Sequence, residues 1–213
     1  MQNCLISLFD YSGNFSLPYR RAGISVVQID IQLGINILTW DYKSWYYLHR
    51  PKQIGIMAAI PCTEYAVSGR RWFAGKDADG RTAHSEMLVA KTKEIIDYFA
   101  ALSILRFWVI ENPISRIHKL NPWMGEIKLK FHPYQFAGYD IIESNSRYNK
   151  MTWLWGQFDL PVPKPLPPLQ KKYPAHTKLG GRSLKTKNIR SKTPLGFAFA
   201  FFAANDFTSQ CPK

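Results

Sequence analysis

Cysteine is scarce in this 213-residue sequence, which contains three, at Cys4, Cys62 and Cys211. An odd number at such wide spacing fits neither a disulfide framework nor a zinc site, so we expect no metal and a reducing, cytoplasmic environment. The first basic residue is Arg20, and the opening residues lack the basic and apolar regions of a signal peptide. No run approaches the ~20 apolar residues that cross a bilayer, so no transmembrane segment is expected.

Acidic residues are missing from a long stretch between Asp159 and Asp206, which carries nine Lys or Arg residues. The formal net charge of the whole chain is +13. This balance favours a polyanionic partner, nucleic acid above all, with an acidic membrane surface as the alternative. The stretch begins with PVPKPLPPLQKKYP, which is too rich in proline for a helix or a central strand. We therefore expect residues 159–192 to form an extended basic connection that is either a solvated linker or a nucleic-acid contact.

Hydrophobic residues make up 46% of the chain, which is enough for one sizeable core in a single domain. Short apolar runs rich in β-branched residues predict buried strands at residues 4–9, 24–31, 54–60 and 104–110. A helix is predicted over residues 83–102, where the apolar residues near helical spacing are Met87, Ala90, Ile95 and Tyr98. The alternation predicts an α/β fold with a mostly parallel sheet. Further runs, at residues 126–131 and 151–155, predict an antiparallel edge.

Polar residues follow each of the four predicted parallel strands. In chain order they are Asp10 with Gly13, then Asp30, then Cys62 after Pro61, and finally Glu111 with Asn112. Ligands of open α/β sheets bind beyond the carboxyl ends of the strands, so we expect these residues to share one crevice. A cysteine and a glutamate at adjacent strand ends offer a nucleophile and an acid that can hydrogen-bond a heterocycle.

Four segments carry a family resemblance between residues 5 and about 113. They are LFDYSGNFSLPYRRAG (8–23), PCTEYAVSG (61–69), DADGRTAHSEMLVAKTKEIIDYF (77–99) and WVIENP (108–113). In this order they resemble the Phe-x-Gly-x-Gly-Gly segment, the Pro-Cys catalytic loop, the Asp-x-Arg-Gly stretch and the Glu-Asn-Val motif of DNA cytosine-5 methyltransferases. Tyr11 and Asn14 stand where that family usually has glycines, and Pro113 replaces its valine.

The resemblance implies a Rossmann-like sheet that binds S-adenosylmethionine, with a catalytic domain over residues 1–158 and a closing helix and tail over residues 193–213. It implies that Cys62 attacks carbon 6 of cytosine while Glu111 assists at ring nitrogen 3. The cofactor-binding residues that it implies are Phe9, Asp10, Gly13, Asn14, Asp30, Ile31, Asn36, Ile37 and Pro61.

DNA is the expected substrate, and the family's large target-recognition domain is missing from this chain. The Gln-x-Arg-x-Arg motif is also not recognisable, and residues 146–156 occupy its place. The residues expected to contact DNA are Ser68, Asn112, Arg116, Arg147, Lys150, Lys185, Lys187 and Arg190. Three alternatives stay open: RNA cytosine methylation, a catalytically silent nucleic-acid-binding relative, and recognition supplied by a partner subunit or a homodimer.

Overall fold

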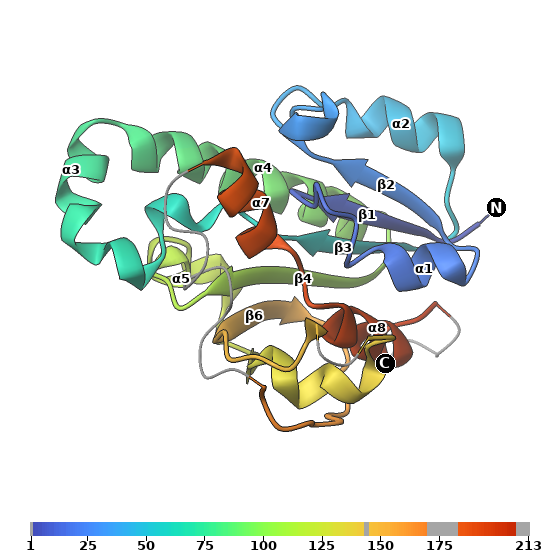
Figure 1. The fold of residues 1–213 in the computed structure, drawn as a ribbon. Coiled ribbons are helices and arrows are strands. Elements are labelled where there is room, and N and C mark those ends of the chain that lie inside the picture. The colour runs from blue at the N-terminus through green and yellow to red at the C-terminus, as the bar shows by residue number, and fades with distance from the viewer. Residues whose placement is uncertain (1, 143–144, 170–182, 208–213) are drawn as a thin grey trace.

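The computed structural model describes residues 2–142, 145–169 and 183–207. Within these residues six strands form one sheet in the order β2-β1-β3-β4-β6-β5 (Figure 1). The strands are β1 (Cys4–Leu8), β2 (Ser25–Ile29), β3 (Ile54–Ala58), β4 (Leu105–Pro113), β5 (Leu129–Phe131) and β6 (Thr152–Gln157). The strands β1 to β4 are parallel, whereas β6 is antiparallel to both of its neighbours. The predicted α/β fold with a mostly parallel sheet and an antiparallel edge is confirmed, and it is compatible with a Rossmann-like fold.

The central strands form where the sequence is apolar without alternation, because both faces of the sheet are covered there. Every residue of β1 and of β3 is buried. Gly55 in β3 allows a close approach, since a Cβ atom there would overlap the ring of Phe107 on β4. The prediction that the fourth strand ends at Ile110 is wrong: β4 continues to Pro113 because β6 pairs with it there.

The α-helices are α1 (Leu17–Arg21), α2 (Tyr42–His49), α3 (Phe73–Ala78), α4 (Arg81–Ala101), α5 (Ile117–Leu120), α7 (Leu184–Ser191) and α8 (Leu195–Ala204). The 3-10 helices are η1 (Ile31–Leu33), η2 (Cys62–Glu64), η3 (Val67–Trp72), η4 (Pro122–Met124) and η5 (Pro133–Tyr139). None of the helices in the described residues combines the length and the hydrophobicity needed to span a bilayer.

Helix α4 covers one face of the sheet, behind the strands in Figure 1. It buries Val89, Ile95 and Phe99 in the core on that face. The predicted apolar stripe is partly wrong, because Met87 is 55% exposed and Ala90 is exposed. Met87 is two positions before the buried Val89, which places the two residues on nearly opposite sides of a helix with about 3.6 residues per turn.

Helices α1 and α8 cover the other face of the sheet, in front of it in Figure 1. Phe197 and Phe201 of α8 are buried, and the Phe201 ring lies 5.1 Å from the ring of Phe15. The Asn14 amide donates a 2.9 Å hydrogen bond to the Thr193 carbonyl oxygen. The closing helix is therefore a core helix, and its leading segment is tied to the loop after β1.

Helix α7 corrects the prediction of a fully extended basic connection. Residues 159–169 form neither helix nor strand, as expected, but residues 184–191 are helical. Ser183 begins this helix by accepting a hydrogen bond from the Thr186 backbone N–H, which is a typical N-cap. Residues 170–182 of the predicted connection lie outside the described residues.

Candidate functional site

The carboxyl ends of the parallel strands meet along one edge of the sheet. β1 lies between β2 and β3, which makes this position the topological switch point where open α/β sheets bind ligands. The strand register places Leu8 level with Ile29 and Ala58, and Ala58 level with Ile110. β3 ends at Ala58, opposite Ile110, so Glu111 is the first residue of β4 that extends past the end of β3.

Cys62 follows β3 and opens the η2 turn at this edge. Its backbone carbonyl accepts hydrogen bonds from the Tyr65 and Ala66 N–H groups, at 3.0 and 2.8 Å. Pro61 is exposed and precedes the turn with φ −51° and ψ 118°, whereas the Cys62 side chain is partly buried. This tight turn holds the thiol close to the end of its strand.

Four charged side chains act on Cys62 or on its partner Glu111. Burial raises the pKa of the Cys62 thiol and the charge of Glu111 raises it further, whereas Lys150 and Arg190 lower it. Burial also raises the pKa of Glu111, with Lys150 opposing that shift and Asp10 adding to it. The fold thus places Glu111 within electrostatic reach of Cys62, and their roles as acid and nucleophile stay predictions. A glutamic acid that keeps its proton can donate to a ring nitrogen, and nearby cations favour a thiolate.

Asn112 joins the end of β4 to the segment that leads to Cys62. It is 1% exposed, and its side-chain amide donates a 2.8 Å hydrogen bond to the Ile60 carbonyl oxygen. No hydrogen-bond partner for its Oδ1 atom is found among the described residues. The observed contact of Asn112 positions the loop, and its contact with DNA stays a prediction.

Arg116 anchors the segment that follows Cys62. Its guanidinium donates to both carboxylate oxygens of Asp77, at 2.6 and 2.8 Å, and to the Glu64 carbonyl oxygen at 3.3 Å. It also lies 3.8 Å from the ring centroid of Phe73. The hydrogen bonds from Arg116 and from Thr82 lower the pKa of Asp77 to about 2. The predicted substrate residue Arg116 is thus already engaged within the protein.

The loop after β1 closes on its own carboxylate. The Asp10 carboxylate accepts hydrogen bonds from the Ser7 hydroxyl (2.9 Å), the Ser12 hydroxyl (3.1 Å) and the Gly13 N–H (2.9 Å). Burial raises the pKa of Asp10, while these hydrogen bonds lower it. Gly13 has φ +68°, a conformation that glycine adopts without strain, and Asn14 fixes the end of the loop to the segment before α8. Asp10 and Asn14 therefore shape the predicted cofactor loop through internal hydrogen bonds.

The other predicted cofactor residues follow β1 and β2 in the sequence. Phe9 is partly buried and has φ +60°, which is uncommon for a residue with a side chain. Asp30 is 8% exposed and accepts a 2.8 Å hydrogen bond from the backbone, whereas Ile31 is 69% exposed. Asn36 accepts a 3.0 Å hydrogen bond from the Leu38 N–H, and Ile37 belongs to the hydrophobic core. Cofactor contacts of all these residues stay predictions.

Helix α7 connects the two sides of the strand-end edge. The Asn188 amide donates a 2.8 Å hydrogen bond to the Gln32 side chain in η1, just beyond β2. The Lys150 ammonium donates a 2.9 Å hydrogen bond to the Arg190 carbonyl oxygen. Together with the effect of Arg190 on the pKa of Cys62, these bonds place α7 beside the candidate site.

The remaining predicted DNA-binding residues are spread over the molecule. Ser68 is exposed in η3, and Lys185 and Lys187 are exposed on α7. The Arg147 guanidinium donates a 2.7 Å hydrogen bond to the Pro167 carbonyl oxygen, so it holds the proline-rich segment. The structure brings Lys150 and Arg190 to the site, and it does not bring Arg147 there by any described contact.

Sequence reasoning missed two features of the segment after Cys62. Trp72 is 54% exposed, and the Arg71 guanidinium lies 5.0 Å from the centroid of its ring. Lys76 and Glu64 form a buried ion pair at 3.1 Å, and Lys76 also donates to the Thr63 carbonyl oxygen. The RRW sequence at residues 70–72, in the segment that follows the candidate nucleophile Cys62, was the available signal, because aromatic and basic residues together are typical of nucleic-acid contacts.

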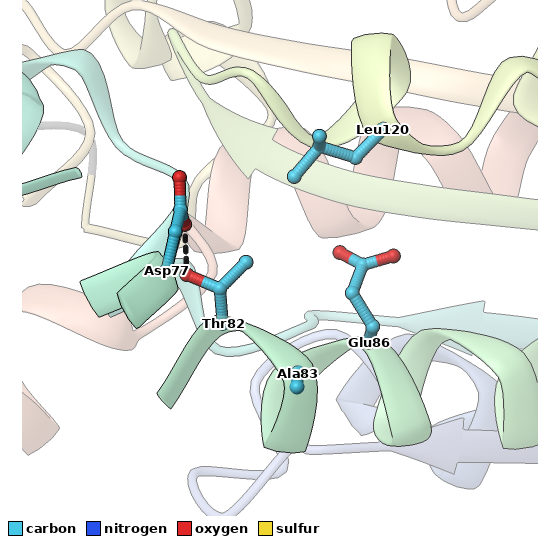
Figure 2. Close-up of a pocket in the computed structure, with 5 residues that line it drawn as sticks. All are labelled: Asp77, Thr82, Ala83, Glu86 and Leu120. Atoms are coloured by element: carbon cyan, nitrogen blue, oxygen red, sulfur yellow. Dashed lines mark hydrogen bonds between the residues drawn. The ribbon is translucent and has the colours of Figure 1, made fainter. Parts of the chain in front are cut away.

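A separate cavity of about 370 Å³ lies between the start of α4 and α5, and it is lined by Asp77, Thr82, Ala83, Glu86 and Leu120 (Figure 2). Most of its polar groups have partners within the protein, although no hydrogen-bond partner for Glu86 Oε1 is found among the described residues. Thr82 donates a 2.6 Å hydrogen bond to Asp77, and Glu86 accepts one of 2.9 Å from Asn121. We therefore regard this cavity as part of the loop anchorage and not as a ligand site.

Comparison with protein-family models and with curated proteins gives no match for this chain. The described residues contain no group of three or more His, Cys, Asp or Glu side chains that is suited to hold a metal ion. The functional interpretation therefore depends on the geometry of the Cys62 and Glu111 site and on the motifs of the sequence.

Proposed function

We propose that this protein transfers a methyl group from S-adenosylmethionine to carbon 5 of cytosine in DNA. The observation that supports the proposal is that Cys62 and Glu111 follow the ends of adjacent parallel strands, beside the topological switch point, and that the charge of Glu111 acts on the pKa of Cys62. A nucleophile and a protonated acid at one strand-end edge are what covalent activation of a heterocycle requires.

In the proposed mechanism the Cys62 thiolate forms a bond to carbon 6 of cytosine. The electron pair of the 5,6 double bond moves onto the ring, and Glu111 donates its proton or a strong hydrogen bond to nitrogen 3. Carbon 5 becomes nucleophilic, and the cofactor would supply an electrophilic methyl group whose bond to the sulfonium sulfur breaks, so that the cofactor leaves as a neutral thioether. Glu111 takes back the proton from nitrogen 3, and loss of the carbon 5 proton to a base restores the 5,6 double bond, which breaks the bond to carbon 6 and releases Cys62 as a thiolate. Burial supports the acid role, because it raises the pKa of Glu111.

The Cys62 thiol needs help to ionise in this site, because its pKa is raised by burial. Lys150 and Arg190 supply positive charge that lowers this pKa. A neutral, protonated Glu111 no longer raises the pKa of Cys62, so the two proposed protonation states favour each other. Lys150 is therefore proposed to stabilise the thiolate as well as to contact the substrate.

The residues around the switch point fit an adenosyl group. Asp30 offers a nearly buried carboxylate for ribose hydroxyls, and the exposed Ile31 and the partly buried Phe9 offer apolar surface for adenine. Gly13 lets the backbone approach the methionine part closely. In this proposal Asp10 acts through the turn that it closes.

The proposed substrate is DNA with the target cytosine unstacked or single-stranded, because a base inside a duplex cannot reach Cys62. The net charge of +13 supports a polyanionic partner, and the exposed Trp72 beside Arg71 supports base contacts near the site. We further propose a reducing compartment such as the cytoplasm, since the chemistry needs a free Cys62 thiol.

The direct test is to incubate the protein with DNA and methyl-labelled S-adenosylmethionine and to analyse the digested nucleosides by mass spectrometry. Labelled 5-methylcytosine is the expected product. The Cys62→Ser variant is expected to lose the activity while it keeps its fold, because a serine hydroxyl is far less ionised than a thiol. The matched control is Cys4→Ala, which replaces a cysteine that is 1% exposed at the start of β1.

Trapping provides the second readout. DNA that carries 5-fluorocytosine should form a covalent adduct with the wild-type protein, because carbon 5 has no proton to lose and Cys62 cannot be released. The Cys62→Ser variant should form no adduct, because it lacks the thiol. Methyl transfer to RNA but not DNA would replace the proposed substrate, and an active Cys62→Ser variant would refute the mechanism.

A further inference from the structure

The antiparallel edge of the sheet presents an aromatic ring and a lysine side by side. Lys130 on β5 and Trp153 on β6 are partners in the strand register, so both side chains lie on the same face of the sheet. Lys130 is exposed and Trp153 is partly exposed. The Lys130 ammonium lies 5.4 Å from the ring centroid of Trp153. This pair is separate from the Cys62 and Glu111 side chains of the proposed active site.

Helix α5 adds the ring of His118 beside Trp153, and the exposed Lys119 follows His118 in the sequence. The His118 ring lies 5.9 Å from Trp153 in an edge-to-face arrangement and stacks on Trp155 at 5.4 Å. Burial lowers the pKa of His118, and the charged groups that lower it further are Lys119 and Lys130. Two lysines, Lys119 and Lys130, are thus within electrostatic reach of His118.

Two polar ring atoms within the cluster have no hydrogen-bond partner among the described residues. They are His118 Nδ1 and Trp155 Nε1, and Trp155 is 0% exposed. Neighbouring buried polar atoms are normally satisfied, so an unpaired pair at one place is unusual. The cluster therefore combines unsatisfied polar atoms, a partly exposed indole and two exposed lysines.

We infer that these four residues, His118, Lys119, Lys130 and Trp153, form a nucleic-acid-binding surface, here named the edge surface. A base of a single-stranded segment stacks on Trp153, and Lys119 and Lys130 contact the adjacent phosphates. Charge complementarity selects a polyanion, and the aromatic ring between lysines selects one that carries planar bases.

The position of the edge surface fits a strand that continues from the proposed active site. Trp153 is the register partner of Asn112, and Asn112 directly follows Glu111. The inference rests on the proposed nucleic-acid substrate, but it does not require methyl transfer. It assigns part of the nucleic-acid binding to the edge of the sheet.

The test is the binding of fluorescent oligo(dT) to the full chain, measured by anisotropy over a series of salt concentrations. Oligo(dT) contains no cytosine, so failure of the proposed chemistry leaves this readout unchanged, and Cys62→Ser should bind it like the wild type. The double variant Lys119→Gln and Lys130→Gln changes two exposed residues and is expected to fold. Its salt slope should flatten by about 1.4, at roughly 0.7 per phosphate contact for single strands.

A matched control removes the same charge elsewhere through Lys43→Gln and Lys52→Gln, both exposed, and it should bind like the wild type. Trp153→Leu should weaken binding at least about 5-fold, and Trp153→Phe should restore part of the affinity, because stacking is worth about 1–3 kcal/mol per base. Equal binding by the two lysine double variants would overturn the inference, whether or not Trp153→Leu folds. If the Lys119→Gln and Lys130→Gln double variant loses affinity for heparin and for oligo(dT) alike, while Trp153→Leu binds oligo(dT) like the wild type, the surface is a general polyanion site. That result would refute the stacking role of Trp153.

Discussion

Replacing Asn112 by alanine removes the hydrogen bond that joins the end of β4 to the segment before Cys62. The donor is 1% exposed and the bond to the Ile60 carbonyl oxygen is 2.8 Å long, so water cannot easily replace it. Leaving a buried acceptor without its donor costs about 1–3 kcal/mol. We therefore expect Asn112→Ala to lower the free energy of unfolding by that amount, and the freed loop to lower the rate of methyl transfer.

Urea unfolding followed by circular dichroism measures the stability, and labelled methyl transfer to DNA measures the activity. The control is Asn188→Ala, which removes a hydrogen bond between side chains at the surface and should change stability by less than about 0.5 kcal/mol. Asn112→Asp cannot donate to the carbonyl oxygen and should be at least as destabilising as the alanine variant. If both Asn112 variants unfold at the wild-type urea concentration, the proposed anchoring of the Cys62 loop is incorrect.

Three further changes test the charge around the site and the fold beneath it. Lys150→Gln removes a charge that lowers the pKa of Cys62, so the pH midpoint for alkylation of Cys62 by iodoacetamide should rise when measured in a Cys211→Ser background. Cys4 should react little, because burial raises its pKa to about 11. An unchanged midpoint for Cys62 would contradict the electrostatic role of Lys150. A second variant neutralises the basic residues on and just after α7, which are Lys185, Lys187, Arg190 and Lys192. Fluorescence anisotropy should show weaker binding to all DNA sequences alike and a salt slope reduced by roughly one unit per lost phosphate contact. Unchanged binding would show that these residues do not contact DNA. Gly156→Ala should strongly lower the melting temperature in thermal unfolding, because Gly156 has φ +135° and a Cβ atom there would overlap the Trp108 carbonyl oxygen. An unchanged melting temperature would show that the β4–β6 pairing is looser than described.

The sequence predicted the parallel part of the sheet well for a physical reason. β1 and β3 are buried on both faces, so their apolar runs are visible without knowledge of any partner. The extension of β4 through Glu111 and Asn112 was missed because it depends on pairing with β6, which begins at Thr152 and is distant in sequence. Non-local pairing of polar residues leaves no periodic signal.

The site residues that directly follow strands could be predicted from the sequence. The side-chain contacts that surround them could not. Cys62 and Glu111 follow adjacent strands whose ends lie level, so the strand register places both residues at one edge of the sheet. The contact of Arg116 with Asp77 and the approach of Lys150 to α7 join distant segments, and no local pattern announces them. Helix α7 was not predicted because its segment is rich in basic residues and lacks an apolar repeat. The N-cap residue Ser183 was the local signal that was available.

The hydrogen bond from Asn14 to the Thr193 carbonyl oxygen has a consequence for biosynthesis. The partners in this bond are 179 positions apart, and the Phe201 ring that packs on Phe15 follows later still. A ribosome-bound chain that has not yet emerged as far as α8 exposes one face of the sheet and lacks this support. Cys62 is thus translated long before its surroundings are complete, so the candidate site should form only after α8 has left the exit tunnel.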